Sequence, residues 1–210
     1  MFSNKKIYTY LVLLGMIFSL AACQPKAMRR LEKMEMFDVS AFEGFMPMEA
    51  GKAKKYRCKI DAYGQKISGI LVVKKQERGT RMLMMTDFGL KVIDIIFREN
   101  GSYQINYLMK HLDYPMVRKA FALNLQMLLT PDRKADLDIY RNQEGILVHD
   151  RAQSLIYFLD KANKLQRVQR YHGNRKLLAE AKMQDEDWIF IQQYKPSIVI
   201  KLKSMDDVKR

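Results

Sequence analysis

Apolar and polar residues alternate along most of the chain after residue 53. Tyr56, Cys58, Ile60 and Ala62 are separated by single polar residues, which is the period-2 pattern of a strand with one buried face. Similar reasoning predicts eleven more strands, at 66–75, 80–86, 90–98, 102–108, 137–141, 145–149, 154–159, 165–171, 176–183, 188–193 and 197–203. Turn residues separate the early strands at intervals of about a dozen residues, and Asn100-Gly101 is a strong hairpin signal. The pattern predicts an antiparallel meander.

The spacing changes once, between the fifth and sixth predicted strands. Apolar residues in 114–129 recur at helical spacing on a broad face, with Pro115 in the first turn and Pro131 just past the end. A helix of about 16 residues is about 24 Å long, too short to cover a flat sheet of about 11 to 12 strands. We therefore expect a mainly β (α+β) fold, in which a strongly curved antiparallel sheet or half-barrel wraps around one main helix and leaves an apolar hollow.

Apolar residues of the helix and of the facing strands are the expected lining of this hollow. They are Leu71, Val73, Met82, Met84, Ile95, Met116, Ala120, Phe121, Leu123 and Leu128. The sequence holds 15 methionines, and their flexible thioether side chains suit a cavity that accepts ligands of varied shape. Taken alone, ordinary filling of a core explains the methionines better.

The first 22 residues have the character of a targeting segment. Lys5 and Lys6 precede 16 uncharged, largely apolar residues at 7–22, which is short for a membrane span of roughly 20 residues and suited to a signal peptide. The run ends in Leu20-Ala21-Ala22-Cys23, which resembles the lipobox of bacterial lipoprotein precursors. That resemblance implies cleavage before Cys23 and attachment of palmitate-like acyl chains to it. The alternative is an uncleaved anchor with an incidental cysteine.

These features divide the chain into a signal peptide at 1–22, a lipid anchor with tether and entry segment at 23–50, and one domain at 51–210. Residues 26–35 are expected to form either a short basic amphipathic helix or a solvated linker, and 37–48 to pack loosely on the domain. Gln24 rather than Asp follows the cysteine, which by resemblance to proteobacterial lipoproteins implies sorting to the outer membrane. The basic residues Lys26 and Arg29 favour its periplasmic face.

The formal net charge is +14, which suits contact with anionic lipid or nucleic acid. No nucleic-acid reader motif accompanies the basic residues, so we expect no nucleic-acid partner and a solvated sheet face near anionic headgroups. Cys23 and Cys58 are the two cysteines, so no disulfide framework is expected.

Catalytic and metal-binding patterns were sought with the same reasoning. His111, His149 and His172 lie on different elements without metal-ligand spacing, and alternation places Cys58 on an apolar face. Asp136 with Asp138, and the acidic residues at 185–187, flank predicted strands, where turn formation or gatekeeping accounts for them. We therefore expect no enzyme, no metal and no cofactor.

Three motifs follow one another in the order of a known family. They are the segment from Met84 to Lys91, which leads to the Asn100-Gly101 hairpin, the helix end Leu128-Leu129-Thr130-Pro131, and the final strand at 198–203. With the lipobox, they resemble the LolB family of outer-membrane lipoprotein receptors over roughly residues 20 to 205. Asp87 stands where that family has proline, a tryptophan-containing helix signature is absent, and 132–175 matches poorly.

The resemblance implies a half-barrel covered by helices, an apolar cavity for acyl chains, and receipt of lipoproteins from a LolA-like periplasmic carrier for insertion into the outer membrane, without catalysis. In that family a turn exposes a leucine that engages the membrane. The matching residue is Phe88, beside Leu90, and we expect both to insert into the bilayer. The alternative is that Phe88 folds back onto the sheet edge. At the level of function, the alternative is a structural or assembly lipoprotein with a filled core and a protein partner.

Overall fold

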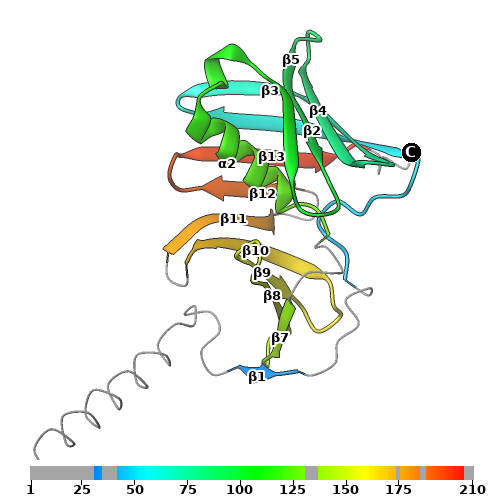
Figure 1. The fold of residues 1–210 in the computed structure, drawn as a ribbon, viewed down its shortest axis with the longest axis vertical. Coiled ribbons are helices and arrows are strands. Elements are labelled where there is room, and N and C mark those ends of the chain that lie inside the picture. The colour runs from blue at the N-terminus through cyan, green and yellow to red at the C-terminus, as the bar shows by residue number, and fades with distance from the viewer. Residues whose placement is uncertain (1–30, 35–41, 131–136, 174–175, 185–187, 206–210) are drawn as a thin grey trace, which may run out of the picture.

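The computed structural model describes residues 31–34, 42–130, 137–173, 176–184 and 188–205. Within them, thirteen strands form a single antiparallel sheet in the order β1-β7-β8-β9-β10-β11-β12-β13-β2-β3-β4-β5-β6 (Figure 1). The strands are β1 (Glu32–Lys33), β2 (Ala53–Ala62), β3 (Gln65–Gln76), β4 (Gly79–Thr86), β5 (Lys91–Phe97), β6 (Tyr103–Leu108), β7 (Leu137–Arg141), β8 (Ile146–Asp150), β9 (Leu155–Leu159), β10 (Leu165–His172), β11 (Lys176–Gln184), β12 (Trp188–Gln193) and β13 (Ile198–Ser204). The sheet is open, with β1 and β6 as its edges.

Alternation along the sequence is matched by alternation of burial in the sheet. In β2 the residues Tyr56, Cys58, Ile60 and Ala62 are all at most 4% exposed, and their neighbours are more exposed. The twelve strands expected from the sequence are all present, with ends that differ by one or two residues at most. The thirteenth, β1, was not predicted. The fold is therefore mainly β, as the sequence indicated.

The sheet curves around the α-helix α2 (Pro115–Gln126), which follows the short 3-10 helix η3 (Lys110–Leu112). Helix α2 contacts both β6 and β12, which are six strand spacings apart in the sheet order. In a flat sheet these two strands would be about 29 Å apart, whereas a helix with its side chains is about 10 to 12 Å wide. The sheet must bend to meet the helix on both sides, as Figure 1 shows.

The buried face of α2 differs in phase from the predicted one. Val117, Ala120, Phe121, Asn124 and Leu125 are buried, at the i, i+3, i+4, i+7 and i+8 positions of one helical stripe. Met116, expected in the lining, lies on another face and is 65% exposed, and Leu123 is only half-buried. The broad apolar run had concealed which stripe faces the sheet.

Residues 42–48, which we call the leading segment, are part of the core rather than loosely attached. Phe42 and Met46 are each 1% exposed, and the Met46 backbone N–H donates to the Leu128 carbonyl at 3.0 Å. Gly44 lies so close to the end of α2 that a Cβ atom would be 2.6 Å from the carbonyl carbon of Leu129. The expectation of loose contact was wrong, because this close backbone approach depends on a single glycine and two large apolar anchors.

The described part of the tether is extended rather than helical. Glu32 and Lys33 pair with Arg141 and Tyr140 of β7, and the Lys33 ammonium lies 2.8 Å from the Asp138 carboxylate, which Arg151 also contacts. Asp138 is thus a buried ion-pair residue within β7, where the sequence analysis expected a turn residue. Cys23, the signal segment 1–22 and the acidic group at 185–187 lie outside the described residues.

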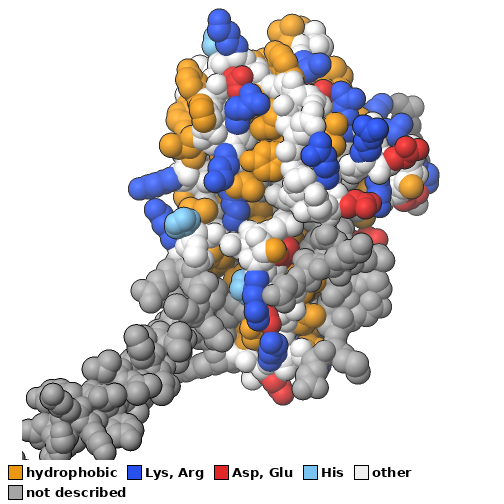
Figure 2. Space-filling model, in the orientation of Figure 1, with side chains coloured by type: hydrophobic (Ala, Val, Ile, Leu, Met, Phe, Trp, Pro, Cys, Tyr) orange, Lys and Arg blue, Asp and Glu red, His pale blue; other side chains and the backbone are white. Residues whose placement is uncertain are grey.

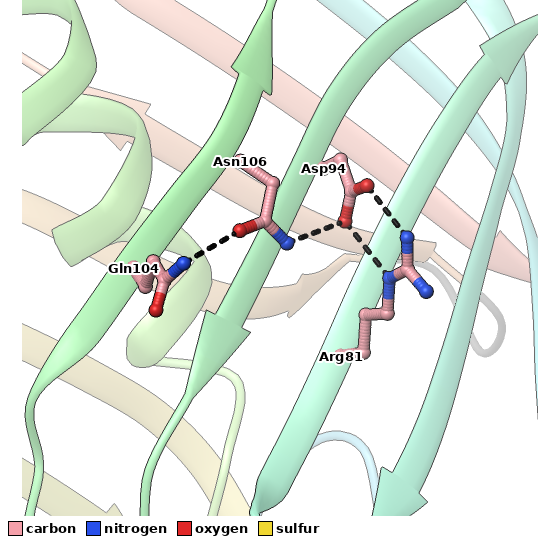
Figure 3. A network of polar contacts seen from close by, with 4 residues as sticks. All are labelled: Arg81, Asp94, Gln104 and Asn106. Atoms are coloured by element: carbon pink, nitrogen blue, oxygen red, sulfur yellow. Dashed lines mark hydrogen bonds and ion pairs between the residues drawn. The ribbon is translucent and has the colours of Figure 1, made fainter.

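A polar network braces the outer face of β4, β5 and β6 (Figure 3). Arg81 donates two hydrogen bonds to the Asp94 carboxylate, at 2.9 and 2.6 Å. Asn106 donates to Asp94 at 3.4 Å and accepts from Gln104 at 3.0 Å. The hydrogen bonds from Arg81 lower the pKa of Asp94, against the opposing effect of burial. This network ties together the three strands at one edge of the sheet.

Candidate functional site

A cavity of about 560 Å³ lies between the end of α2, the leading segment and the turns that join β3 to β4 and β5 to β6. Its apolar wall contains Phe42, Met46, Phe97, Leu129 and Tyr157. The rings of Phe42 and Tyr157 meet edge to face, with their centroids 5.2 Å apart. A volume between about 300 and 1,000 Å³ is typical of small-molecule sites in proteins, so the cavity is large enough for a ligand.

The mouth of the cavity is polar and carries charges of both signs. Lys75, Arg98, Glu43 and Glu99 line it and are exposed. Deeper polar groups come from Gln126 and Gln153, and Gln126 donates from Nε2 to the Gly101 carbonyl at 2.8 Å. The cavity thus combines nearly buried aromatic and aliphatic side chains with at least as much polar surface, so it offers contacts to both parts of an amphiphilic ligand.

The ten residues predicted to line a hollow lie elsewhere. Eight of them belong to one packed core between α2 and the sheet, at 5% exposure or less: Leu71, Val73, Met82, Met84, Ile95, Ala120, Phe121 and Leu128. Met116 and Leu123 lie outside that core, and none of the ten lines the 560 Å³ cavity. The prediction placed the hollow at the middle of the helix, where side chains fill the space, whereas the cavity lies at its C-terminal end.

Phe88 stands at the tip of the turn between β4 and β5 and is 94% exposed, and Leu90 is 62% exposed. The Thr86 carbonyl accepts from the Gly89 N–H at 2.9 Å, and the Thr86 N–H donates to the Leu90 carbonyl at 2.8 Å. Gly89 adopts a φ of +82°, which glycine tolerates without strain. The backbone of the turn is therefore fixed with Phe88 pointing outward, and Phe88 does not fold back onto the sheet.

Asp87 gives this turn a side-chain contact with a neighbouring part of the sheet. Its carboxylate accepts from Arg57 Nη1 at 2.6 Å and from Ser68 Oγ at 3.4 Å. Both donors are on the neighbouring hairpin of β2 and β3. The ion pair between Asp87 and Arg57 thus connects the turn to that hairpin.

Other exposed apolar side chains lie at the same ends of the strands. One side of the sheet holds the turns after β2, β4 and β12 and the end of β6. This follows from the paired positions Ala62–Gln65, Gly69–Thr86, Ile198–Ala62 and Ile93–Leu108. The exposed apolar residues there, which we call the aromatic edge, are Tyr63, Phe88, Leu90, Tyr114, Met116 and Tyr194. This edge is the largest gathering of such side chains in the described part of the molecule.

Cations surround the aromatic edge. Lys66, Lys91, Lys110 and Lys195 are exposed there, whereas Asp87 and Asp113 are engaged with Arg57 and Arg118 at 2.6 and 2.5 Å. Figure 2 shows Lys and Arg side chains interspersed with hydrophobic ones over the upper part of the molecule, where α2 lies. Aromatic and basic side chains together are typical of surfaces at a membrane interface.

Candidate chemistry was examined at the titratable residues. Cys58 is 1% exposed, and burial raises the pKa of its thiol far above the ordinary value, so it is held in its neutral, unreactive form. Within the described ranges, no three His, Cys, Asp or Glu side chains gather as a metal site. None of the helices there has the length and apolar character needed to span a bilayer.

One buried polar cluster was missed by the sequence analysis. Arg170 of β10, Asn124 of α2 and Gln193 of β12 are each 5% exposed or less. Arg170 donates from Nη2 to Asn124 Oδ1 at 3.1 Å and to Gln193 Oε1 at 2.6 Å. Three elements distant in the sequence supply these residues, so no local motif could have revealed them. Asn124 lies at the centre of the buried face of α2, between Phe121 and Leu125.

Comparisons with known proteins gave no matching family model and no matching curated protein. Among solved structures, the chain is similar to an outer membrane lipoprotein-sorting protein domain from Vibrio parahaemolyticus, with 9% identity over 81% of this chain and 89% of that chain and a TM-score of 0.44. It is also similar to a DUF1329 family protein from Desulfovibrio piger, with 10% identity over 75% of this chain and 86% of that chain and a TM-score of 0.39.

Proposed function

We propose that this protein is an outer-membrane lipoprotein, anchored through acylated Cys23, that binds acyl chains and receives or inserts lipoproteins or lipids without catalysis at the periplasmic face. The observation that carries the proposal is the 560 Å³ cavity, with its aromatic wall and polar mouth. An acyl chain would lie against Phe42, Met46 and Tyr157.

The aromatic edge supplies the second part of the proposal, which is delivery to a membrane. Phe88 and Leu90 project from a turn that hydrogen bonds hold in place, and lysines flank them. Burial of a phenylalanine side chain contributes roughly 1.5 to 3 kcal/mol, and each nearby lysine adds about 1 kcal/mol at an anionic surface. We infer that this edge meets the bilayer when the protein receives cargo from a LolA-like carrier or inserts it into the membrane.

The alternative function is a structural lipoprotein with a filled core and a protein partner. It is favoured by one observation, which is that eight of the residues expected to line a hollow are packed into the core. In that case the cavity beside α2 would hold only solvent, and the aromatic edge would meet a protein. The two functions differ in whether an acyl chain enters the cavity.

Photolabelling separates them. The full mature protein, embedded in lipid nanodiscs, is irradiated with a palmitic acid analogue that carries a diazirine near the chain end. Under our proposal, label appears in peptides that contain residues 42–48, 97–101, 126–130 and 153–157, because these segments line the cavity. Label confined to the aromatic edge would contradict acyl binding in the cavity.

A matched pair of variants controls for surface labelling. Leu129→Trp enlarges a half-buried side chain that lines the cavity, and Leu83→Trp makes the same change at a half-buried position of β4 that does not line it. We expect the first variant to lose cavity label and the second to keep it. Equal labelling of both would favour the structural alternative.

A further inference from the structure

The cluster of Arg170, Asn124 and Gln193 contains hydrogen-bond donors that have no acceptor. Arg170 Nε, Arg170 Nη1 and Asn124 Nδ2 are buried and lack any partner. Rotating the Asn124 amide would turn its NH₂ toward Arg170 Nη2, which is also a donor, so the hydrogen bond from Arg170 fixes its orientation. All three unsatisfied atoms therefore present N–H groups, and a group that satisfies them must be an acceptor.

Arg170 is also an unpaired charge. Burial lowers the pKa of its guanidinium to about 10, an effect that neighbouring Tyr103 opposes, so it remains protonated at neutral pH. Among the described residues it forms no ion pair. Asp150 lies on the same face two strands away, through the pairs Asp150–Leu155 and Leu155–Arg170, and it accepts from the Gln153 N–H at 3.0 Å. A buried, uncompensated cation is costly to a fold, so its retention requires a reason.

The cluster lies beside the cavity. Leu155, the neighbour of Arg170 across β9 and β10, is two residues from both Gln153 and Tyr157, which line the cavity. Val168 pairs with Tyr157 and shares a face with Arg170, because residues two apart in a strand point the same way at a spacing of about 6.6 Å. Arg170 is thus on the same face of the sheet as Tyr157, one strand away and two residues along, although Arg170 does not itself line the cavity.

We propose that Arg170, with Asn124, binds the anionic headgroup of an amphiphile whose chain occupies the cavity. The headgroup would be a carboxylate or phosphate, whose oxygens accept from Arg170 Nε and Nη1 as a forked pair and from Asn124 Nδ2. Gln193 holds the guanidinium in place through Nη2. This proposal rests on the proposed function, since it names the ligand class for the same cavity and puts the headgroup at the inner end.

The test compares two photoreactive probes of equal chain length on the full mature protein in nanodiscs, one with a carboxylate end and one with an alcohol end. We expect half-maximal labelling of the cavity peptides at a concentration about tenfold lower or more for the acid, because hydrogen bonds to charged groups are the stronger class. Arg170→Gln should abolish this preference, and Arg170→Lys should keep part of it. Arg167→Gln, which removes an arginine stacked 4.1 Å from the Phe158 ring, should leave it unchanged.

Competition then identifies the headgroup. If hexadecyl phosphate displaces the acid probe as effectively as palmitate does, the site accepts either anion. If inorganic phosphate without an acyl chain displaces the probe, the site takes the free ion. Displacement by palmitate but by neither phosphate would restrict the headgroup to a carboxylate, and no displacement by any of the three would contradict the choice of an anion. Equal labelling by acid and alcohol in the wild type would overturn the proposal for Arg170 while leaving acyl binding intact, and failure of both probes would overturn the proposed function itself.

Stability separates a ligand site from a structural arginine. If Arg170 serves a ligand, palmitate should raise the Tm of the wild type by more than it raises the Tm of Arg170→Gln, because only the wild type binds the headgroup. An equal rise in both proteins would assign Arg170 to the fold instead, where it donates to Asn124 and Gln193.

Discussion

Replacing Phe42 with alanine tests whether the leading segment is a fixed wall of the cavity. Phe42 is 1% exposed, forms the edge-to-face contact with Tyr157, and lines the cavity. Truncation of a buried phenylalanine costs about 3 to 5 kcal/mol, and the lost ring contact accounts for about 0.5 to 1.5 kcal/mol beyond area burial in such pairs. For a chain of this size, each kcal/mol shifts the Tm by about 2 to 4 °C, so we expect Phe42→Ala to lower the Tm by about 6 to 20 °C.

The assay is thermal unfolding of the full mature protein in nonionic detergent, followed by circular dichroism. Phe88→Ala is the matched control, because it removes the same side chain from a position that is 94% exposed, and it should change the free energy of unfolding by no more than about 0.5 kcal/mol. A cost below about 1 kcal/mol for Phe42→Ala would refute the reasoning, since it would mean that residues 42–48 attach loosely, as the sequence alone had indicated.

Two further predictions concern the membrane. Phe88→Glu should slow lipid transfer into vesicles of anionic phospholipid by about tenfold or more. The variant loses a phenylalanine that would be buried in the bilayer and gains a negative charge that anionic lipids repel. Met205→Glu, at the opposite ends of the strands and 36% exposed, should leave the transfer rate unchanged. Equal transfer rates in both variants would exclude a role of the aromatic edge in lipid transfer. Cys23→Ala should abolish labelling by a fatty-acid analogue and leave an unprocessed precursor. Persistent labelling of that variant would contradict the lipobox assignment.

Most of the sheet was predictable because its determinants are local. Alternation in β2 and the turn signals at Gly89 and Asn100-Gly101 each act over a few residues, and the structure has a strand or turn at each. The burial of Cys58 followed from the same period. The curvature of the sheet followed from a comparison of the length of the helix with the number of strands that this one helix had to cover.

Features built from distant segments could not be predicted in this way. The pairing of Glu32 with Arg141 joins residues more than a hundred positions apart, and the close approach of Gly44 to the end of α2 has no local signature. The phase of α2 was obscured because apolar residues occupy several of its faces, so Met116 was assigned inward and Asn124 was overlooked. The position of the cavity depends on which side chains fill the middle of the helix, which a residue pattern does not encode.

The central claim is that an acyl chain occupies the cavity at the end of α2. Native mass spectrometry of the intact mature protein, released gently from membranes, measures this directly. The account predicts a species carrying one noncovalent acyl lipid in addition to the chains attached at Cys23. It also predicts that Leu129→Trp lacks this species and that Leu83→Trp retains it. A wild-type protein free of bound lipid, or the same lipid content in both variants, would contradict the account.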